Sequence, residues 1–573
     1  MLAWLHGSAT GLLVLCGLVG LVAGLGAVGF RYLIYGFTLL FSGHRDYSAT
    51  PHAANPLVPG LGMWFVLLAP VVGGLIYGPL IALFAREARG HGVPEVMLAV
   101  QRKGGRIRPQ VAIVKSLASA LCIGAGGSVG REGPIVQIGS AIGSALGQVA
   151  RLPESRMRLL VACGAAGGIS ATFNTPIAGV FFAMELILRD FDARSLGNVV
   201  VASVGANVVS RAFFGNAAFL KLPVFQLVSP WEFVLYAILG GVAALAGLAF
   251  IRVLYGTEDL CDRLWRGRPE WARPAVGGVI LGLLLLALPQ MYGVGYPVLQ
   301  GAINGRYVAW FMVVLLVGKM AATSLTIGIG GSGGVFAPSL FMGAMLGTAF
   351  GQLVHTVLPR LTASPGAYGL VGMGAVFAAA SRAPMTAILI IFELTGEYRV
   401  ILPLMFAVAL ATGISHLLSR DTIYTLKLRR RGIEIDQERR PSIVDLLTVA
   451  DAMHAVPPVL HADDDLQTVI RRFTQEHRGA LPVLDAQGQF LGTVSQAGVE
   501  RAIGEGDAGL TAGQLADERV TLRAGQRLEE AIVALTEHEA SGLPVRNEAG
   551  ALVGWVRHRD VLQAYAVRLR QTT

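Results

Sequence analysis

One apolar, glycine-rich segment occurs twice in this chain. Residues 115–149 align without a gap on residues 319–353, with 15 identities in 35 positions. A second pair follows at nearly the same offset, where residues 164–186 match residues 372–394. Duplicated hydrophobic halves that Gly and Pro interrupt at corresponding positions are typical of membrane transporters, whose site lies where broken helices meet near the midplane. The duplication therefore predicts a transport protein.

Composition places the duplicated region in lipid. Hydrophobic residues make up 53% of the 573 residues and charged residues only 14%, which excludes an ordinary soluble protein. Runs long enough to span a hydrocarbon core of about 30 Å occur at residues 8–41, 61–85, 231–254, 273–289, 308–329 and 399–419. Shorter Gly-rich pieces lie between them, and irregular backbone at this depth is tolerated only where it is buried or lines a cavity. Close helix packing accounts for some of the 73 glycines.

The two ends of the apolar region indicate its topology. Residues 1–9 lack a basic segment, and the run after them is too long for a cleaved signal peptide, so it is predicted as the first membrane helix. Lys427 and Arg429 to Arg431 follow the last run and place the C-terminal region in the cytoplasm. No aromatic platform accompanies these arginines, so nucleic-acid binding is not indicated. The four cysteines lack metal-ligand spacing, so neither a disulfide framework nor a metal site is predicted.

Glycine-led segments before apolar helical stretches are the candidate binding elements. In residues 130–134, G-R-E-G-P, the proline marks a helix start, and the glycines let the backbone approach a ligand closely. Such a start presents N–H groups and partial positive charge, which suit an anion. One helix terminus contributes only about 0.3–1 kcal/mol, so several must converge. Residues 334–338, G-V-F-A-P, are the repeat counterpart, and residues 90–94, G-H-G-V-P, have the same character.

These segments, with a tyrosine after the last apolar run, resemble the CLC family of chloride channels and chloride/proton exchangers. The matching residues are G-H-G-V-P, G-R-E-G-P, G-V-F-A-P and Tyr424 in D-T-I-Y-T-L-K-L. The resemblance extends over about residues 8–431. It implies a homodimer with one anion pathway per subunit, built from two inverted halves whose helix ends face a central ion.

The resemblance also implies roles for single residues. The amides of Val335 and Phe336 and the hydroxyl of Tyr424 line the central site in this interpretation. The complete set of predicted anion-binding residues is His91, Gly92, Gly130, Arg131, Gly133, Gly334, Val335, Phe336 and Tyr424. Glu132 is implied to be the gate.

The chemistry of Glu132 favours the same role. An ionisable residue in a membrane segment is costly and is a functional candidate by default. A local ion pair with Arg131 does not explain it, because adjacent positions on a helix do not face each other. A carboxylate at an anion site occupies that site until an anion displaces it, and protonation removes the competing charge. Glu132 is therefore predicted to be both gate and proton carrier, coupling one proton to anion passage.

His91 departs from the family's pattern, because most chloride-handling members have Ser at this position. An imidazole N–H can still donate to the ion, and a protonated ring adds positive charge. The alternative is a ring that points away, so that only its backbone contacts the ion. Chloride is the first predicted anion, with nitrate or another halide as the alternative.

Leu186 is the second departure. Many exchangers of this family have a pair of Glu residues here, and the second receives protons from the cytoplasm. Leucine cannot relay a proton, although water can carry protons to Glu132. Glu185 has a repeat counterpart in Glu393, which favours a shared structural role. A passive anion channel of the same fold, gated by voltage or pH, is therefore the alternative to anion/proton antiport.

The tail is a separate soluble region. After about residue 440, charged residues become frequent and the continuous apolar runs end. Residues 480–499 match residues 542–561 at an offset of 62, and an amphipathic helix precedes each copy. The pattern resembles a tandem pair of CBS domains over about residues 445–568, a module that often binds adenine nucleotides.

The resemblance leaves nucleotide binding by the tail open. Nucleotide-binding members carry Ser or Thr followed three residues later by Asp. The first copy has Ser495 but Gly498, and the second has Asp560 but Arg557. Asp560 is the predicted contact to an adenine nucleotide, and a structural dimerisation and docking module is the alternative.

Together these features predict a mainly α, polytopic membrane protein with two inverted, Gly-rich helical repeats and a cytoplasmic α/β pair of CBS domains. The predicted parts are a transport domain (1–431, with halves at about 8–215 and 230–425), a linker (432–444) and the tail (445–573, with copies at about 445–505 and 510–568). The predicted function is anion transport coupled to proton antiport in a bacterial plasma (inner) membrane. No catalytic spacing or P-loop indicates an enzyme. A membrane-anchored nucleotide sensor is the remote alternative.

Overall fold

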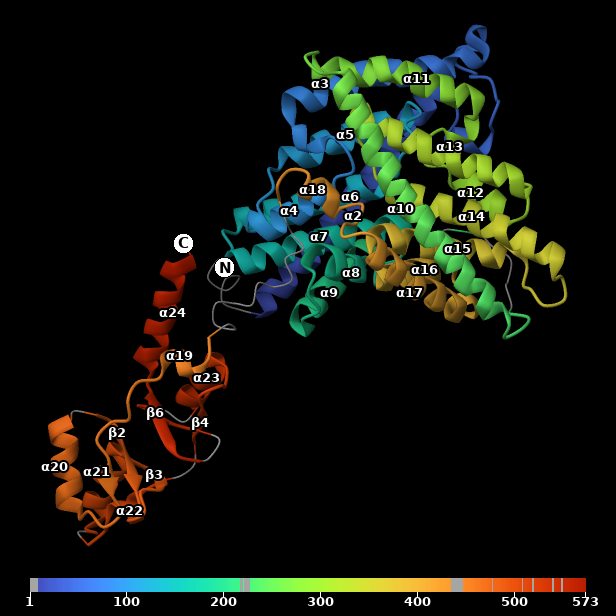
Figure 1. The fold of residues 1–573 in the computed structure, drawn as a ribbon. Helices are drawn as coiled ribbons and strands as arrows, with labels where there is room; N and C mark the ends of the chain where they lie inside the picture. The colour runs from blue at the N-terminus through green and yellow to red at the C-terminus, as the bar shows by residue number, and fades with distance from the viewer. Residues whose placement is uncertain are drawn as a thin grey trace. The chain divides into compact units, whose positions relative to one another are not determined.

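The apolar region and the tail form two units of the computed structural model, Met1–Ile435 and Asp436–Thr573 (Figure 1). The structure describes residues 9–216, 220, 227–433, 447–476, 478–507, 509–517, 520–537, 541–547 and 550–572. The predicted linker, residues 432–444, lies outside the described residues except for Gly432 and Ile433.

Helices build the membrane unit. Its first half contains α2 (Ala9–Ser42), α3 (Phe65–Phe84), α4 (Val93–Arg102), α5 (Gln110–Gly124), α6 (Glu132–Val149), α7 (Glu154–Phe173), α8 (Pro176–Phe182) with the π-helical turn Ala183–Leu188, and α9 (Ala193–Phe214). Its second half contains α10 (Glu232–Leu264), α11 (Arg273–Ala287), α12 (Tyr296–Ile303), α13 (Ala309–Gly328), α14 (Phe336–Val357), α15 (Pro365–Ser381), α16 (Pro384–Thr395), α17 (Ile401–Leu418) and α18 (Thr425–Arg429). Short 3₁₀ turns lie at Tyr47–Ala49, Pro59–Trp64, Arg86–Ala88, Glu270–Ala272, Pro289–Met291 and Tyr398–Val400.

Among the described residues, eight helical segments are long and apolar enough to cross a bilayer. Six of them match the predicted apolar runs. Hydropathy alone misses α9 and α14, because small and polar residues lower their mean hydropathy to 1.3. Helix α14 lies in the Gly-rich duplicated segment at residues 319–353, whereas α9 follows the duplicated segment at residues 164–186.

The two halves break their helices at corresponding positions. Helices α7 and α15 end at residues in the left-handed conformation, Asn174 with φ 61° and Arg382 with φ 53°. Pro176 and Pro384 then begin α8 and α16, where a missing N–H costs nothing. The duplicated sequence therefore gives a duplicated backbone.

Glycines bring neighbouring helices into backbone contact in both halves. A Cβ atom at Gly139 of α6 would lie 2.1 Å from the carbonyl oxygen of Gly164 in α7. In the second half, a Cβ at Gly343 of α14 would lie 2.3 Å from the carbonyl oxygen of Gly372 in α15. These positions are part of the glycine content that the sequence attributes to close helix packing.

Reciprocal contacts join the two halves. The hydroxyl of Ser119 lies 2.8 Å from that of Ser332, and the hydroxyl of Thr323 donates to the carbonyl oxygen of Ser128 at 2.7 Å. In the repeat alignment Ser119 corresponds to Thr323, and Ser128 corresponds to Ser332. The two contacts therefore join corresponding pairs of residues, as expected when a pseudo-two-fold axis relates the halves.

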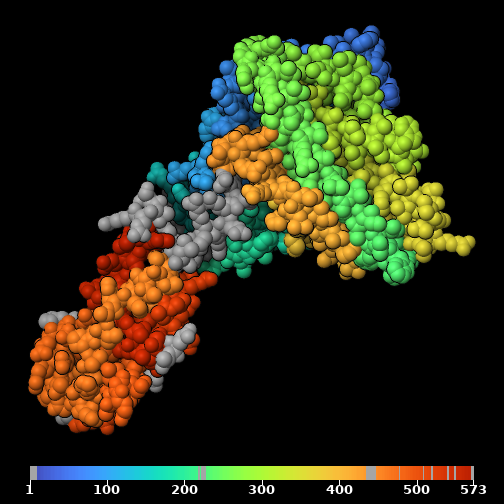
Figure 2. Space-filling view, in the orientation of Figure 1, coloured from blue at the N-terminus to red at the C-terminus, as the bar shows by residue number. Residues whose placement is uncertain are grey.

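Helices α10 and α17 pack together on the surface of the membrane unit, where α10 forms the green band in Figure 2 and α17 lies in the orange region beside it. Many outward side chains on these helices are large and apolar. Examples are Val234, Ile238, Leu245, Leu402, Met405 and Phe406. This surface suits lipid tails or another apolar surface better than water.

The tail contains two similar three-stranded sheets. The first consists of β1 (Leu460–His461), β2 (Ala480–Leu484) and β3 (Phe490–Ser495), and the second of β4 (Leu522–Arg523), β5 (Leu543–Arg546) and β6 (Leu552–Val556). In each sheet the first two strands pair parallel and the last two antiparallel. The helices of the tail are α19 (Val449–Ala452), α20 (Leu466–Glu476), α21 (Gln496–Glu505), α22 (Ala512–Leu515), α23 (Leu528–Glu537) and α24 (His558–Thr572).

The two tail copies exchange their leading segments. His454, which precedes the first sheet, exchanges backbone hydrogen bonds of 2.9 and 3.0 Å with Trp555 of the second sheet. Asp517, which precedes the second sheet, exchanges bonds of 2.9 and 3.0 Å with Thr493 of the first. Each sheet is therefore hydrogen-bonded to the segment that precedes the other sheet.

Candidate anion-binding site

Three glycine-led segments lie together between the halves. They are the His91 segment (residues 90–94), the Glu132 segment (residues 130–134) and the Phe336 segment (residues 334–338). Gly130 N donates to Gly334 O at 2.8 Å, and Gly334 N donates to Gly130 O at 2.5 Å. Gly90 N donates to Gly331 O at 3.0 Å, which joins the His91 segment to the residues just before the Phe336 segment. The structure thus brings together the three helix starts on which the predicted site depends.

Each segment leads directly into a helix. Gly92, with φ 79°, precedes α4, while Arg131 and Val335 are the N-cap residues of α6 and α14. A Cβ at Gly133 would lie 2.0 Å from the carbonyl oxygen of His91, so only glycine permits this approach. The first N–H groups of three helices, with their partial positive charge, therefore meet in a small region.

Glu132 is the first residue of α6, and its carboxylate reaches the other half. The side chain is 1% exposed. Its Oε2 accepts a hydrogen bond from the backbone N of Ala337 at 3.3 Å, in the first turn of α14. Its Oε1 accepts one from the hydroxyl of Tyr296 at 2.7 Å. A negative group of the chain thus occupies the start of a helix that presents positive charge.

Arg131 is buried beside this carboxylate. Its guanidinium donates to the carbonyl oxygen of Thr172 at 3.3 Å. The same group lies 5.5 Å from the ring centroid of Phe173 and 5.4 Å from that of Tyr296. An anion-binding role for the guanidinium stays a prediction, while its contacts fix the two aromatic rings around Glu132.

His91 is buried, with its Nε2 3.3 Å from the hydroxyl of Tyr255. That hydroxyl donates its own proton to the carbonyl oxygen of Ile423 at 2.6 Å, so the Nε2 of His91 is the donor to Tyr255. Among the described residues, Nδ1 of His91 has no hydrogen-bond partner. The ring lies 6.0 Å from that of Tyr424, which is also buried. A neutral His91 in this tautomer offers no second N–H, so only a protonated ring can donate through Nδ1.

Tyr296 is a functional candidate that sequence reasoning missed. It belongs to residues 293–297, G-V-G-Y-P, which repeat the G-x-G-x-P spacing of the His91 segment in the second half. Gly295, with φ 90°, precedes α12 as Gly92 precedes α4. The signal was present in the sequence, but the matching segment lies outside the two aligned pairs.

Two buried lysines at aligned positions support these loops. Lys115 Nζ donates to the carbonyl oxygens of Ala88 at 2.8 Å and Gly90 at 2.7 Å. Lys319 Nζ donates at 2.9 Å to the carbonyl oxygens of Gly293 and Val294 and to the hydroxyl of Ser128. Each ammonium group thereby holds the G-x-G-x-P loop of its own half.

Glu185 and Glu393 bind the helix starts of the opposite halves. Glu185 accepts from the backbone N of Met385 at 3.2 Å and of Thr386 at 2.9 Å, at the start of α16. Glu393 accepts from the backbone N of Ile177 at 3.0 Å and of Ala178 at 2.7 Å, at the start of α8. This reciprocal capping is the shared structural role that their correspondence predicts.

Asp560 lies in the tail, where its carboxylate accepts three hydrogen bonds from Arg557. Its Oδ2 accepts from the backbone N and the Nε of Arg557 at 3.1 and 2.8 Å, and its Oδ1 accepts from the guanidinium at 3.0 Å. Burial raises the pKa of Asp560, but the hydrogen bonds and charge of Arg557 outweigh burial and hold it below its usual range. The predicted nucleotide contact is thus already in an ion pair and caps α24.

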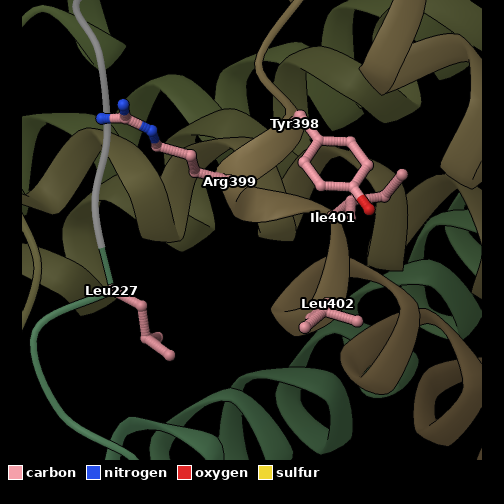
Figure 3. A pocket seen from close by; sticks show the side chains of 5 residues that line it. All are labelled: Leu227, Tyr398, Arg399, Ile401 and Leu402. Carbon is pink, nitrogen blue, oxygen red and sulfur yellow. The ribbon is translucent and has the colours of Figure 1, made fainter.

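A pocket of about 500 Å³ lies at the start of α17. Figure 3 shows Tyr398, Ile401 and Leu402 on one side of it, with Leu227 opposite. None of its lining residues belongs to the three glycine-led segments, so it is separate from the candidate site.

The comparisons with known proteins agree with this geometry. The family model described as voltage gated chloride channel matches residues 73–416. The CBS domain model matches residues 449–505 and 512–567. A putative chloride channel protein ClcB-like from Ralstonia nicotianae is 35% identical over 424 residues, which cover 73% of this chain and 97% of the relative.

Two exchangers are also similar. The H(+)/Cl(-) exchange transporter ClcA of Vibrio vulnificus is 34% identical over 449 residues, covering 76% of this chain and 93% of that protein. The crystal structure of a slow cyanobacterial Cl⁻/H⁺ antiporter has a TM-score of 0.66 and 27% identity, covering 75% of this chain and 99% of that one. With its long apolar helices, this chain is a multi-pass integral membrane protein that belongs to the voltage-gated chloride channel (CLC) family and carries a tandem pair of CBS domains.

Proposed function

We propose that this protein is a secondary active transporter that exchanges an anion, chloride first, for protons. The observation that carries the proposal is the contact between the carboxylate of Glu132 and the backbone N of Ala337 at the start of α14. A negative group of the chain there lies where three helix starts converge. The same arrangement suits a small anion, because backbone N–H groups and helix dipoles favour any negative charge.

The gating role of Glu132 follows from competition for this region. While ionised, its carboxylate repels an incoming anion and binds the backbone N of Ala337, beside the amides of Val335 and Phe336 that are proposed to bind the anion. Protonation removes the negative charge and weakens these hydrogen bonds, so the side chain leaves and an anion enters. One carboxyl group therefore links the binding of a proton to the passage of an anion, which is the requirement for exchange.

Chloride is the proposed anion because two of the similar proteins are named as chloride/proton exchangers. The amides of Val335 and Phe336 at the start of α14, and the hydroxyl of Tyr424, are the proposed donors to it. His91 replaces the Ser hydroxyl of most chloride-handling members with an imidazole, so its protonation state is proposed to influence anion affinity.

We also propose the assembly and location that the resemblance implies. The protein is a homodimer with one pathway per subunit, in the plasma membrane of a bacterium. The CBS pair lies in the cytoplasm, consistent with the basic residues at the end of the membrane unit. An adenine nucleotide at the pair remains a proposal, and binding through Asp560 requires that nucleotide to displace Arg557.

A passive anion channel is the second candidate function. Leu186 and Glu185 favour it, because the first has no exchangeable proton and the second is committed to the start of α16. An exchanger with these residues requires water to carry protons to Glu132. The two functions differ in one measurable quantity, which is proton movement against its own gradient.

Proteoliposomes containing the full chain distinguish the candidates. An imposed chloride gradient should drive protons uphill in the wild type. Glu132→Gln, which mimics the protonated side chain, should abolish proton movement and leave chloride flux independent of pH. Glu154→Gln, at an exposed acid on α7, is the control and should behave as the wild type. Chloride flux without any uphill proton movement in the wild type would establish the channel instead.

A further inference from the structure

We infer that Tyr296 is a positioning residue that holds ionised Glu132 in the anion site and so sets the pH at which the site opens. This inference rests on the proposed gating role of Glu132. It assigns a function to the G-V-G-Y-P segment, which is the fourth glycine-led helix start of the membrane unit.

The fourth helix start differs from the other three in what it supplies. The His91, Glu132 and Phe336 segments bring the first N–H groups of α4, α6 and α14 into one region. The G-V-G-Y-P segment has Tyr296 at the position that Val93 occupies in the His91 segment. The second half thereby supplies a hydroxyl group where the first half has an aliphatic side chain.

This hydroxyl forms the shorter of the two hydrogen bonds that hold the carboxylate of Glu132 to the second half. It donates to Oε1 at 2.7 Å, whereas the backbone N of Ala337 donates to Oε2 at 3.3 Å. The two donors lie on different helices, α12 and α14, and hold the two oxygens separately. The carboxylate is therefore fixed at both oxygens in the position that an anion has to take.

The ring of Tyr296 is itself held in place. Phe173 packs edge-on against it, with centroids 6.3 Å apart and an interplanar angle of 83°. The guanidinium of Arg131 lies 5.4 Å from the ring centroid. Gly295 sets the direction of α12 with its φ of 90°. A donor that is fixed in advance loses little side-chain entropy on binding the carboxylate.

A hydroxyl donor favours the ionised form of Glu132. Hydrogen bonds to a charged acceptor are stronger than those to a neutral carboxylic acid. Other groups that interact electrostatically with Glu132 are Arg131 at the start of α6, Lys319 on α13 and Tyr424 before α18. Lys319 and Tyr424 keep their contacts when only the hydroxyl of Tyr296 is removed, and Arg131, which also hydrogen-bonds that hydroxyl, keeps its bond to the carbonyl oxygen of Thr172. The midpoint of the pH dependence should therefore move in one direction, because protonation becomes easier.

The same contact also sets how strongly Glu132 competes with the anion. When Glu132 is ionised, a weaker hold on the carboxylate lets chloride displace it at a lower concentration. When Glu132 is protonated, the competition is absent and the hydroxyl has little effect. Removal of the hydroxyl should therefore lower the apparent KM for chloride above the midpoint pH and leave it nearly unchanged below that pH.

Tyr296→Phe in the full chain tests the inference, with chloride flux measured in proteoliposomes as a function of pH. We expect the midpoint to rise by about one pH unit. Tyr292→Phe is the matched control: this tyrosine lies four residues earlier, and its buried hydroxyl donates to the carbonyl oxygen of Gly124 at 2.7 Å. It should leave the midpoint unchanged, since its hydroxyl does not contact Glu132.

A double substitution separates a positioning role from a general change of structure. In a Glu132→Gln background, Tyr296→Phe should no longer alter the pH profile. A folded Tyr296→Phe protein with the wild-type midpoint, or a shift that persists without Glu132, overturns the inference while leaving Glu132 as the gate. A wild-type pH profile in Glu132→Gln alone overturns the gating role and this inference with it.

Discussion

The two halves of the membrane unit share a backbone and differ in chemistry. Both have a buried lysine at the same aligned position, a left-handed residue before a proline, and a glycine that lets two helices touch. At the candidate site, Glu132 corresponds to Phe336 and Arg131 to Val335. The residues that support the loops are therefore duplicated, whereas the two charged residues of the candidate site, Arg131 and Glu132, belong to the first half.

This difference shows how a duplicated fold can produce an asymmetric site, to which the two halves contribute different chemical groups. Two identical halves would give two carboxylates or none. Here the first half contributes one acid, and the second half contributes the helix start and the tyrosine that bind it. The shared features should be equally important in both halves, while the unshared features should not be interchangeable.

The buried lysines test the shared part of this comparison with the largest expected loss of stability. Lys115→Met removes the ammonium donor from the carbonyl oxygens of Ala88 and Gly90, which keep weaker neutral donors in Ser332 and Gly333, and Lys319→Met removes the ammonium donor from two carbonyls in the other half. A hydrogen bond from a charged donor contributes about 1.5–3 kcal/mol. Both variants should unfold at clearly lower temperature in detergent, whereas Lys103→Met, on an exposed loop, should not. A loss in only one half would break the equivalence of the two loops.

Gly133 tests an unshared position. Its counterpart in the second half is Ala337, but a Cβ at Gly133 would lie 2.0 Å from the carbonyl oxygen of His91. Gly133→Ala should cost about 1–3 kcal/mol through overpacking. It should also weaken chloride binding, measured by calorimetry, because the His91 and Glu132 segments are forced apart. The reverse exchange, Ala337→Gly, should cost only about 0.5–1 kcal/mol. Equal costs would show that the close approach is not specific to the first half.

The tail offers the same comparison between its two copies. Ser495 caps α21 in the first copy through Gly498, at 3.1 Å, whereas Arg557 pairs with Asp560 at the start of α24 in the second. Arg557→Met should destabilise the tail by about 1–3 kcal/mol, because it leaves a buried carboxylate without its main donor. The matched control is Arg501→Met, at an exposed arginine of α21 in the first copy.

The ion pair also gives the tail a pH dependence. The pKa of Asp560 is depressed in the folded protein, so its stabilisation is complete above the ordinary Asp pKa of about 3.9. That stabilisation is lost as pH falls through the folded value. Unfolding of the tail within the full chain, followed as pH falls from about 6 to about 2, should show this acid loss in the wild type and a reduced loss in Arg557→Met. An identical pH profile in both proteins would contradict the pairing.

The helix caps formed by Glu185 and Glu393 should give the smallest loss of stability. Glu185→Ala and Glu393→Ala each remove an acceptor from two backbone N–H groups at a helix start, which costs about 0.5–2 kcal/mol. We expect similar decreases in thermal stability from the two variants and unchanged coupling of protons to chloride. Loss of proton movement in Glu185→Ala alone would instead assign Glu185 to the proton route.

The sequence was sufficient for features that are local or repeated. The duplication, the proline-marked helix starts and the intramembrane carboxylate predict a site between two halves, and the structure brings those three segments together. Hydropathy did not find α9 and α14, because their small and polar residues dilute the apolar signal. Tyr296 was missed because its G-x-G-x-P segment lies outside the two aligned pairs, and its contact with Glu132 depends on how the two halves pack, which periodicity does not report.

The same limit explains the other long-range features. Glu185 and Glu393 were recognised as counterparts, but only the structure shows that each binds the opposite half. The exchange of leading segments in the tail joins His454 to Trp555, 101 positions later, and Thr493 to Asp517, 24 positions later. No local sequence pattern indicates either the helix caps between the halves or the exchange in the tail. Asp560 was selected as a nucleotide contact from spacing alone, whereas Arg557, three residues earlier, determines its environment.

The most direct test of the central claim is to locate the anion itself. Crystals of Glu132→Gln grown in bromide should give an anomalous peak at the starts of α4, α6 and α14, within hydrogen-bonding distance of the amides near residue 336. Wild-type crystals at high pH should show the carboxylate of Glu132 in that position, held by Tyr296. A peak elsewhere in the membrane unit, or bromide and an ionised Glu132 present together at this position, would contradict the account.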